Sequence, residues 1–408
     1  MRSLCVAEAY PWPSDDGYKL RLSNTIEALR LLGDVDFLCM DGSGRERDPA
    51  PSGVRVLSAP EDPELTPGRW APRWIAASEP RRLVRRDFST ARRLAPGLLS
   101  APYDVTLFSH VDAWHATHDL VDGPAVLDFD NLEDLALRGL RRLGPRVDVG
   151  ASLQAKAIGY GRWAVTSVVN RIDEGRWNAV QHRAAAAVDR VLVCSEMDIA
   201  RSGCSNVSVM ANGYELPWEP VDHDDPHDAD KPTFTFVGVM GYPPNVDAVR
   251  WFADRVLPLV HRTGPGARFR IVGRSAEAVA DLDLFDGVSV VGAVDSMRDE
   301  LAAADVAVVP IRSGAGTRLK VLEAMANGLP MVSTTVGCEG IDVADRQQLL
   351  IADGPEAFAA ACLEAATDVA LRRRMIQAGR ARFEERYTWS AIRESTAEIV
   401  RSAISEHR

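Results

Sequence analysis

Short apolar runs of strand length alternate with amphipathic helical segments along almost the whole chain. The run from Leu4 to Ala7 is followed by a loop, a helical pattern over 20–32 and a second apolar run over 35–40. Consecutive parallel strands need such crossover segments between them. Further strand signals lie at 54–57, 105–108, 126–129, 191–194, 234–238, 268–272, 288–291, 306–311 and 331–333. The sequence therefore predicts an α/β protein with doubly wound parallel sheets.

The length of 408 residues exceeds what one hydrophobic core usually supports, so two domains are expected. The turn dipeptide Asn212-Gly213 precedes a polar run at 222–230 that is rich in Asp and His, and strand signals restart after it. We predict an N-terminal domain over 1–215, a linker over 216–231 and a C-terminal domain over 232–385. An ordinary surface loop is the alternative interpretation of the polar run.

Composition excludes several classes of protein. The 47 basic and 58 acidic residues give a net charge of −11, which does not favour a nucleic-acid binder. No apolar run approaches the roughly 20 residues of a membrane-spanning helix, and the N-terminus does not resemble a signal peptide. The six cysteines are scattered without a CxxC pair, which is typical of a reducing compartment. We therefore expect a cytoplasmic protein.

The segment from Pro310 to Pro330 carries the strongest chemical signal. It follows a buried-strand run, contains a glycine-rich turn and leads into a helical pattern. The turn residues are Gly314, Ala315, Gly316 and Thr317. A glycine-rich turn at a helix N-terminus offers free N–H groups and the positive end of the helix dipole, so this segment predicts an anion site, with phosphate as the obvious ligand.

Three charged side chains follow this turn. Arg318 and Lys320 lie in the predicted first helical turn, where the helix dipole disfavours cations, and a bound anion would reverse that sign. The alternative is a solvated Arg318 and an ion pair between Lys320 and Glu323. Glu323 lies one turn further on, where its carboxylate can accept hydrogen bonds from a vicinal diol such as ribose, or simply face solvent.

At this point the chain resembles the GT-B fold glycosyltransferases, in particular the retaining family 4, also called glycosyl transferases group 1. The matching segments are Phe236-Val-Gly-Val-Met-Gly, Pro244-Asn-Val-Asp-Ala-Val-Arg-Trp-Phe, Phe269-Arg-Ile-Val-Gly-Arg, Val288-Ser-Val-Val-Gly, Gly316-Thr-Arg-Leu-Lys-Val-Leu-Glu-Ala-Met-Ala and Thr388-Trp389. They cover most of 232–400. In the N-terminal half the resemblance is limited to Asp16-Gly17, Val191-Leu-Val-Cys-Ser-Glu196 and Asn212-Gly213.

The resemblance implies two Rossmann-like domains facing each other across a cleft, with a C-terminal helix over 386–408 that crosses back to the first domain. It implies a nucleotide diphosphate sugar as co-substrate in the second domain and no other cofactor. Arg318 and Lys320, with the amides of 314–317, would hold the diphosphate, and Glu323 would hold the ribose. The remaining donor-side residues implied by the resemblance are Gly17, Gly238, Arg274, Val291 and Val294.

One position departs from the pattern of the family. A second glutamate commonly lies eight residues before the ribose-binding one, and Ala315 occupies that position. Loop amides would then replace its sugar contacts. This departure motivates one alternative function, a catalytically silent protein that binds nucleotide sugars.

Polar residues also follow strand signals in the N-terminal half. His110 comes directly after the run at 105–108, where open α/β sheets place ligands, and we predict that it donates a hydrogen bond to the donor. His115 and His118 lack a supporting carboxylate spacing, so we expect no zinc site. Asp128, Asp130 and Asn131 either shape the acceptor site or cap the next helix. Because the Arg318 and Lys320 loop already serves the diphosphate, we do not interpret Asp128-Phe-Asp130 as a GT-A metal motif.

The predicted reaction is metal-independent transfer of a sugar to an acceptor hydroxyl or amine, with retention of configuration and with His110, Arg318 and Lys320 as catalytic residues. A GT-B nucleotide-sugar epimerase is a further alternative. An NAD-dependent dehydrogenase is disfavoured because no GxGxxG follows the first strand. We expect the acceptor to be a small molecule, a glycan or a lipid-linked compound. Residues 69–93, with eight arginines and two tryptophans, suggest weak peripheral membrane contact or a solvated helical surface.

Overall fold

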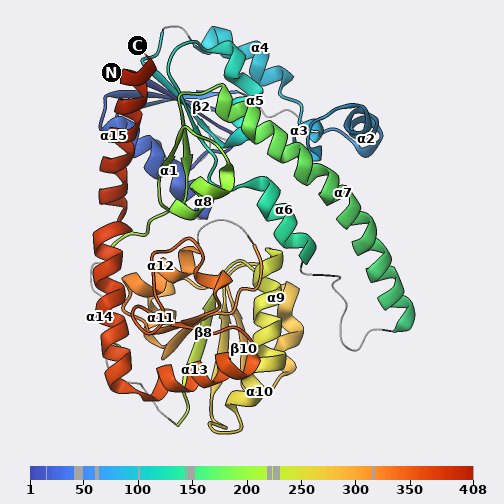
Figure 1. Cartoon of the computed structure of the whole chain (residues 1–408), viewed down its shortest axis with the longest axis vertical. Coiled ribbons are helices and arrows are strands. Elements are labelled where there is room, and N and C mark those ends of the chain that lie inside the picture. The colour runs from blue at the N-terminus through green and yellow to red at the C-terminus, as the bar shows by residue number, and fades with distance from the viewer. Residues whose placement is uncertain are drawn as a thin grey trace. The chain divides into compact units, whose positions relative to one another are not determined.

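The computed structural model of the chain describes residues 1–14, 16–40, 49–59, 64–99, 102–142, 144, 152–217, 223, 230–314 and 318–407 (Figure 1). The chain forms two compact units. Unit 1 comprises Met1–Asn212 together with Trp389–Arg408, and unit 2 comprises Gly213–Thr388. Each unit is built around its own parallel sheet, which confirms the predicted α/β class.

The sheet of unit 1 has seven parallel strands among the described residues, in the order β3-β2-β1-β4-β5-β6-β7. Their bounds are β1 Arg2–Ala7, β2 Asp34–Cys39, β3 Val54–Ser58, β4 Val105–Ser109, β5 Ala125–Asp128, β6 Arg190–Val193 and β7 Val207–Val209. The register pairs Val6 with Leu38 on one side and with Phe108 on the other. Both neighbours of β1 are thus parallel to it, and the strand order reverses between β1 and β4.

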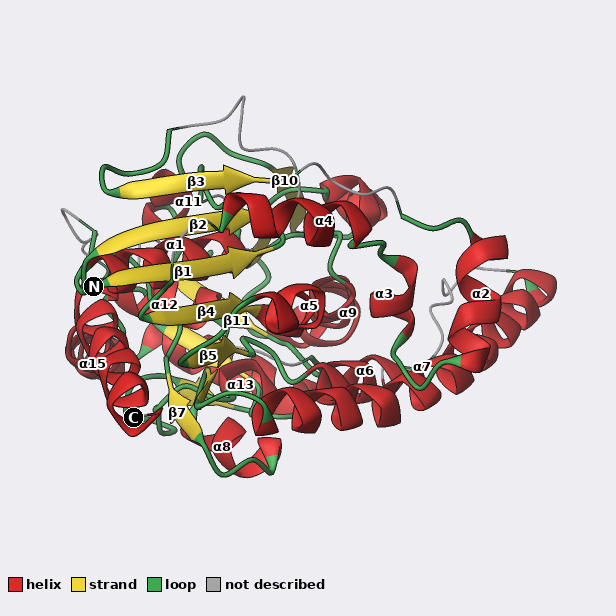
Figure 2. Ribbon diagram, turned by 90° about the horizontal axis from the view of Figure 1, so that it is seen from above, coloured by secondary structure: helices red, strands yellow, loops and turns green. Residues whose placement is uncertain are grey.

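Helices cover both faces of this sheet (Figure 2). They are α1 Gly17–Arg30, α2 Pro67–Ala76, α3 Arg81–Arg85, α4 Ser89–Leu98, α5 His110–Thr117, α6 Glu133–Arg142, α7 Leu153–Ala186 and α8 Glu196–Ser202, with a 3-10 turn η1 at His118–Leu120. Side chains of β1 alternate between two apolar clusters, Leu4 and Val6 in one and Cys5 and Ala7 in the other. This alternation is what a strand buried on both faces requires.

The C-terminal helix α15, Trp389–His407, belongs to unit 1. Trp389 and Val400 are buried in the same apolar cluster as Leu22 and Ile26 of α1. The Nε of Arg393 donates to Oδ1 of Asn24 at 2.7 Å. The last helix therefore completes one face of the first sheet, although it is far from that sheet in sequence.

The sheet of unit 2 has six parallel strands among the described residues, in the order β10-β9-β8-β11-β12-β13. Their bounds are β8 Thr233–Val237, β9 Arg268–Val272, β10 Val288–Gly292, β11 Val306–Val309, β12 Met331–Ser333 and β13 Leu350–Ile351. Here the strand order reverses between β8 and β11. Such a reversal marks the place where open α/β sheets bind ligands, outside the carboxyl ends of the strands.

The helices of unit 2 are α9 Pro243–Trp251, η2 Phe252–Val256, α10 Leu257–Val260, η3 Ala276–Leu284, α11 Met297–Ala302, α12 Leu319–Ala326, η4 Val336–Cys338, α13 Pro355–Thr367 and α14 Val369–Arg386. The core is aromatic at its centre. The ring of Phe252 lies 4.3 Å from that of Phe269 and 6.0 Å from that of Phe358. These buried rings pack η2 and α13 against β9.

Most of the predicted linker, 218–222 and 224–229, lies outside the described residues. His223 is described, and it is buried in unit 2, where its carbonyl accepts a hydrogen bond from Nη2 of Arg372 at 3.0 Å. The chain passes from unit 1 to unit 2 between Asn212 and Gly213 and returns after Thr388. Among the helices described, none is long and apolar enough to cross a bilayer.

Candidate functional site

The strand order of unit 2 reverses between β8 and β11, and two glycine-containing segments follow these strands. Gly238 comes directly after β8, and the segment from Pro310 to Gly314 comes directly after β11. Gly273 follows β9, and a Cβ atom on it, where φ is 139°, would lie 1.9 Å from the carbonyl oxygen of Gly238. The loops after β8 and β9 therefore touch through bare backbone. The carboxyl edge of the sheet is therefore closely packed here without large side chains in the way.

Asn245 organises this edge. Its Nδ2 donates to the carbonyl of Val239 at 2.9 Å, and its Oδ1 accepts a hydrogen bond from Nζ of Lys320 at 3.2 Å. A Cβ on Gly238 would lie 2.8 Å from Nδ2 of Asn245, closer than real Cβ contacts come. Glycine at 238 thus leaves the room that this amide needs.

Lys320 lies in the first turn of α12 and is half-buried. Its ammonium lies 5.1 Å from the ring centre of Phe236, in addition to its hydrogen bond with Asn245. Burial, together with the charge of Arg318, lowers the pKa of Lys320 to about 7. A lysine with this pKa is poised to gain a full charge when an anion arrives.

Arg318 is the N-cap residue of α12, one position before the helical turn that the sequence predicted for it. Its side chain is buried, and its Nε donates to the carbonyl of Val336 at 3.4 Å. A Cβ on Gly314 would lie 3.2 Å from the nearer guanidinium nitrogen of Arg318 and 3.4 Å from the hydroxyl oxygen of Tyr242. The glycine-rich turn, one arginine and one tyrosine hydroxyl thus meet at one point.

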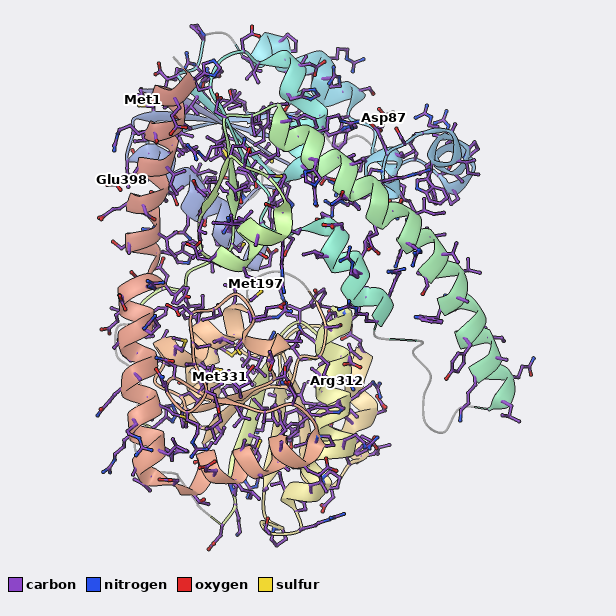
Figure 3. All side chains as sticks on the ribbon, viewed as in Figure 1. Met1, Asp87, Met197, Arg312, Met331 and Glu398 are labelled. Atoms are coloured by element: carbon purple, nitrogen blue, oxygen red, sulfur yellow. The ribbon has the colours of Figure 1, made fainter. Side chains whose placement is uncertain are left out.

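Of the other residues in the glycine-rich turn and just before it, the structure describes Arg312 and Ser313. The Oγ of Ser313 is buried and, among the described residues, has no hydrogen-bond partner. Ala315, Gly316 and Thr317, predicted as donor-binding residues, lie outside the described residues. Arg312 points to α9, where it pairs with Asp247 at 2.6 Å and lies over Trp251 (Figure 3).

Glu323 lies one turn further along α12 and is half-buried. Its Oε1 accepts a hydrogen bond from the hydroxyl of Tyr214 at 2.9 Å. Burial raises the pKa of Glu323, whereas the hydrogen bond from Tyr214 and the charge of Lys320 oppose that rise. The structure records no ion pair between Lys320 and Glu323, both of which it describes, so the alternative interpretation of these two charges is not what the structure has.

This arrangement suits a nucleoside diphosphate. Arg318 lies beside Gly314, Lys320 lies in the first turn of α12, and Glu323 offers a carboxylate to a vicinal diol one helical turn further on. Across the described residues, no group of three His, Cys, Asp or Glu side chains has the arrangement of a metal site.

Four other donor-side predictions lie at the carboxyl ends of the two sheets. Arg274 follows β9, is exposed, and accepts a hydrogen bond from the N–H of Met240 at its carbonyl, 2.8 Å away. Val291 is the next-to-last residue of β10 and Val294 follows that strand, and both are half-buried. Gly17 is the first residue of α1 in unit 1. Their contacts with a donor stay predictions.

In unit 1, His110 and Asp130 follow the adjacent strands β4 and β5. Both are non-glycine residues in the left-handed region, with φ of 70° and 53°, and Nε2 of His110 lies 3.3 Å from Oδ2 of Asp130. Burial opposes the charged imidazole, but the hydrogen bond and the charge of Asp130 outweigh it and raise the pKa of His110 to about 9. Strained backbone that presents a charged pair at a strand end is a feature of functional sites.

Asp128 has a structural role. Both of its carboxylate oxygens accept hydrogen bonds at 2.7 Å from Arg21, a guanidinium that is 1 % exposed. The Nη1 of Arg21 also donates to the carbonyl of Met210 and to Oδ1 of Asn212. We therefore interpret Asp128 as the partner of a buried arginine rather than as an acceptor ligand, in contrast to its predicted role.

The helix-capping alternative for this segment is also not what the structure has. The N–H of Glu133, the first residue of α6, donates to Oε1 of Gln181 at 2.8 Å. Asn131 is half-buried in the turn before α6, and its N–H donates to the carbonyl of Phe129. Asp130 and Asn131 remain candidate acceptor residues.

His115 and His118 have partners of their own. Nε2 of His115 lies 3.8 Å from Oε2 of Glu79, and Nδ1 of His118 lies 2.9 Å from the carbonyl of Trp114. The ring of His118 is stacked on Trp114 with centroids 4.2 Å apart. The two imidazoles therefore serve local contacts of α5 and its neighbours.

Sequence reasoning missed Glu8. It follows β1 directly, beside the place where the strand order of unit 1 reverses, and its side chain is 18 % exposed. One oxygen pairs with Arg86, and the other is buried without a hydrogen-bond partner among the described residues. Burial and the charge of Asp112 raise the pKa of Glu8 to about 7. Its position after the first strand was the signal that would have found it.

The described residues of unit 1 also line a cavity of about 230 Å³ between α3, α6 and α7. Arg82 lies over the ring of Trp177 at 4.5 Å and binds Asp112 and Glu133. The cavity is lined by Glu64, Arg81, Arg82, Arg85, Glu133, Leu137, Asp173 and Trp177. Its charges are largely paired with one another.

The comparison with protein families finds a match within unit 2. The model of the glycosyl transferases group 1 family matches residues 231–368. A protein of Klebsiella pneumoniae described as an uncharacterized 44.6 kDa protein in the cps region is 30% identical over 134 residues. That match covers 30% of this chain and 34% of the relative, so it spans about a third of each protein. The resemblance to the glycosyl transferases group 1 is thus confirmed over residues 231–368.

Solved structures resemble the whole chain. Sucrose-phosphate synthase from Thermosynechococcus elongatus has a TM-score of 0.70 at 18% identity, covering 99% of both chains. HepE from Anabaena, solved with UDP and glucose, has a TM-score of 0.59 at 12% identity and covers 98% of this chain and 100% of its own. HepE was also solved with UDP-glucose. At these identities the likeness concerns the fold, and it confirms the expected GT-B fold.

Proposed function

We propose that the protein is a glycosyltransferase that moves a sugar from a nucleoside diphosphate sugar to an acceptor hydroxyl or amine, with retention of configuration. The observation that carries the proposal is the closeness of Arg318 to Gly314 at the start of α12, with Lys320 in the first turn of that helix and Glu323 one turn further on. The family match over 231–368 covers all four positions and supports the same conclusion.

The chemistry of transfer places most of its demand on the leaving diphosphate. Charge develops on the oxygen that leaves the sugar, and fixed cations in a partly dehydrated site stabilise it without reorganisation. Lys320 is suited to this because desolvation lowers its pKa to about 7, so the ammonium gains stabilisation as phosphate charge appears. Arg318 supplies a second charge that does not titrate.

The two cations account for the proposed independence from metal ions. A diphosphate in GT-A enzymes is neutralised by a divalent ion, whereas Arg318 and Lys320 can occupy that role here. We expect full activity in excess EDTA, with the nucleotide sugar as the sole co-substrate and no bound cofactor. Loss of activity that Mg²⁺ or Mn²⁺ restores would contradict this assignment.

We assign the acceptor to the carboxyl edge of the sheet in unit 1. Glu8 and His110 follow the two strands at which the strand order reverses, and Asp130 and Asn131 follow the next strand. The unpartnered oxygen of Glu8 can accept a hydrogen bond from an acceptor hydroxyl, and a pKa of about 7 allows it to take that proton. His110, charged at neutral pH, can donate to the sugar or phosphate of the donor.

We propose that the protein works in a reducing compartment, the cytoplasm, as the sequence analysis predicts. All six cysteines are free, and five of them are buried. HepE was solved with UDP and with UDP-glucose, which makes a uridine diphosphate sugar the first donor to try.

The proposal is tested by a thermal-shift screen over UDP, GDP, ADP, TDP and CDP and their sugars. A ligand present at 100 times its dissociation constant should stabilise the chain by about 2.7 kcal/mol. Lys320→Ala should abolish the shift and lower transfer by orders of magnitude while the unliganded melting temperature is retained. No shift with any nucleotide would overturn the proposal.

Product analysis separates glycosyl transfer from the alternatives. A transferase releases nucleoside diphosphate in step with a glycosylated acceptor. An epimerase would release an altered sugar without an acceptor. A silent binding protein, the alternative raised by Ala315, would show the thermal shift with no turnover in the presence of any acceptor.

A further inference from the structure

The N-terminal half of α7 carries an apolar stripe that no part of the described structure covers. We propose that this stripe binds the surface of an anionic lipid bilayer, with the helix lying in the plane of the headgroups. The proposal goes beyond glycosyl transfer and does not depend on it, because it concerns a different part of unit 1.

The stripe consists of Ile158, Val165, Val168 and Ile172. These side chains are 56%, 67%, 61% and 42% exposed. At 100° per residue the four positions fall within an arc of about 80°, so they lie along one side of the helix. Leu153, 87% exposed, and Tyr160, 57% exposed, add apolar surface at the same end of α7. Scattered single apolar residues are normal on a protein surface, whereas a continuous stripe marks a site of interaction.

Cations border this stripe on both sides. By the same helical geometry, Arg162 lies about 40° beyond one edge of the stripe and Arg171 about 60° beyond the other. Both arginines are exposed. Long basic side chains in these positions can rest on lipid while their charged ends reach the phosphates, which is the pattern of helices that lie in a membrane interface.

Acidic residues are missing from this stretch of sequence. From 152 to 172 there is no Asp or Glu, whereas the whole chain has 58 of them and a net charge of −11. The first acids after the stretch, Asp173 and Glu174, have partners on other elements. Asp173 accepts a hydrogen bond from Nε1 of Trp74 at 2.7 Å, and Glu174 pairs with Arg138 at 2.8 Å. The cationic character of the stripe is therefore local and uncompensated.

Helix α2 extends the surface. It lies beside the middle of α7 in both Figure 1 and Figure 2, and it is joined there by the bond from Trp74 to Asp173 and by Arg176, which donates to the carbonyl of Trp74. Arg69 and Arg73 are exposed on α2, and Ile75 is 74% exposed. Residues 65–78 also contain no acid. The basic segment seen in the sequence thus adjoins the apolar stripe.

Charge decides between a bilayer and a second copy of the chain as the occupant. Two copies meeting through this stripe would bring Arg162 and Arg171 of each against those of the other, with no carboxylate in either stretch to pair with them. An anionic bilayer supplies both the apolar layer and the phosphates. Each basic residue near such a surface contributes about a five-fold factor in binding, which salt reduces.

The test is flotation of the full chain with vesicles of phosphatidylcholine alone or of phosphatidylcholine and phosphatidylglycerol at 7:3. We expect the wild-type chain to float with the anionic vesicles and to dissociate in 0.5 M NaCl. Val165→Glu with Val168→Glu should abolish flotation. Arg162→Gln with Arg171→Gln should lower the partition coefficient about 25-fold.

Leu31→Glu with Leu284→Glu is the matched control. It adds the same two charges at side chains that are 57% and 89% exposed, outside α2 and α7, and should float like wild type. Melting temperatures of all variants establish that each is folded. The proposal would be overturned if the wild-type chain remained in the bottom fraction in the presence of anionic vesicles. It would also be overturned if the Val165→Glu, Val168→Glu variant still floated with them. So would a dimer in sedimentation velocity that this variant dissociates, since the stripe would then serve self-association.

Discussion

The side-chain amide of Asn245 holds the ammonium of Lys320 and the loop after β8 at the same time. Its Oδ1 lies 3.2 Å from Nζ of Lys320, and its Nδ2 donates to the carbonyl of Val239. Asn245 lies on α9 and Lys320 on α12, so one amide connects two helices that flank the reversal of strand order. A neutral acceptor at this place positions the ammonium without neutralising it.

Replacing Asn245 by Asp tests this arrangement. A carboxylate at the same distance would pair with Lys320 and repel a diphosphate, so the affinity for a nucleotide sugar should fall on the order of ten-fold or more. Asn245→Ala removes the positioning contact without adding charge and should have a smaller effect. Isothermal titration calorimetry measures both. Equal affinities in wild type and Asn245→Asp would place the diphosphate elsewhere.

The pKa of Lys320, lowered to about 7 by burial and by Arg318, predicts that the donor binds together with a proton. At pH 8 the free lysine is about nine-tenths neutral, and a bound diphosphate favours the charged form. A nucleotide sugar, whose phosphates do not titrate near neutrality, should therefore take up close to one proton at pH 8 and far less at pH 6. Calorimetry in buffers of different ionisation enthalpy measures this uptake.

Lys320→Arg is the control for proton uptake. Arginine keeps the positive charge but does not titrate in this range. The variant should still bind nucleotide sugar, and its uptake at pH 8 should be near zero. Uptake that is unchanged in Lys320→Arg would assign the proton to another group.

The carboxylate of Glu323 predicts discrimination between ribose and deoxyribose. A hydrogen bond to a charged group contributes about 1.5–3 kcal/mol, so a 2′-deoxy nucleotide should bind at least ten-fold more weakly than its ribose counterpart. Glu323→Gln should bind the two with similar affinity, because the charged acceptor is gone. Competition between the two nucleotides in the thermal-shift assay measures the ratio. A ratio that Glu323→Gln leaves unchanged would remove Glu323 from the ribose site.

The sequence predicted the parts of the site that lie within one segment. Strand, glycine turn and helix follow one another over 306–326, so the places of Lys320 and Glu323 on α12 could be inferred from order alone. The hydrogen-bond partners of these two side chains could not be inferred in this way. Asn245 is 75 residues from Lys320, and Tyr214 is 109 residues from Glu323, and only the packing of the sheet brings them together.

The same reasoning applies to unit 1. His110 was found because it follows a strand, but Glu8 has the same position and was missed, since an acidic residue in a loop has no distinctive pattern around it. Arg21 lies within the predicted helical pattern over 20–32, and nothing in the surrounding sequence singles it out. Its complete burial against Asp128 depends on a contact across 107 residues, which no local pattern encodes.

The pair of His110 and Asp130 predicts a pH-dependent contribution to stability. The pKa of His110 is about 9 in the folded chain and about 6.5 when unfolded, so the contribution is complete below pH 6.5 and is lost as the pH rises through 9. The difference in unfolding free energy between wild type and His110→Gln should therefore shrink between pH 6.5 and 9.5, by on the order of 1–3 kcal/mol. Lys320 titrates in this window in both proteins, so its effect cancels in the difference.

Urea unfolding at several pH values measures this difference. His110→Gln keeps a donor for Asp130, so steric effects on the strained turn are limited. A difference that is constant from pH 6.5 to 9.5 would mean that His110 is neutral in the folded chain. It could not then be the charged donor that the proposed function assigns to it.

The buried pair of Arg21 and Asp128 predicts a large loss of stability on removal of one partner. Arg21→Met leaves the Asp128 carboxylate buried at 2 % exposure without its two hydrogen bonds at 2.7 Å, which should cost about 3–5 kcal/mol.

Arg55→Met is the matched control. Arg55 is 50% exposed and pairs with Asp36, which also binds Arg2 and Tyr103, so its loss should cost about 1 kcal/mol or less. Urea unfolding followed by tryptophan fluorescence compares the two. Because Arg21 also binds Met210 and Asn212, the last residues of the first segment of unit 1, equal losses in the two variants would mean that this network does not hold the unit together.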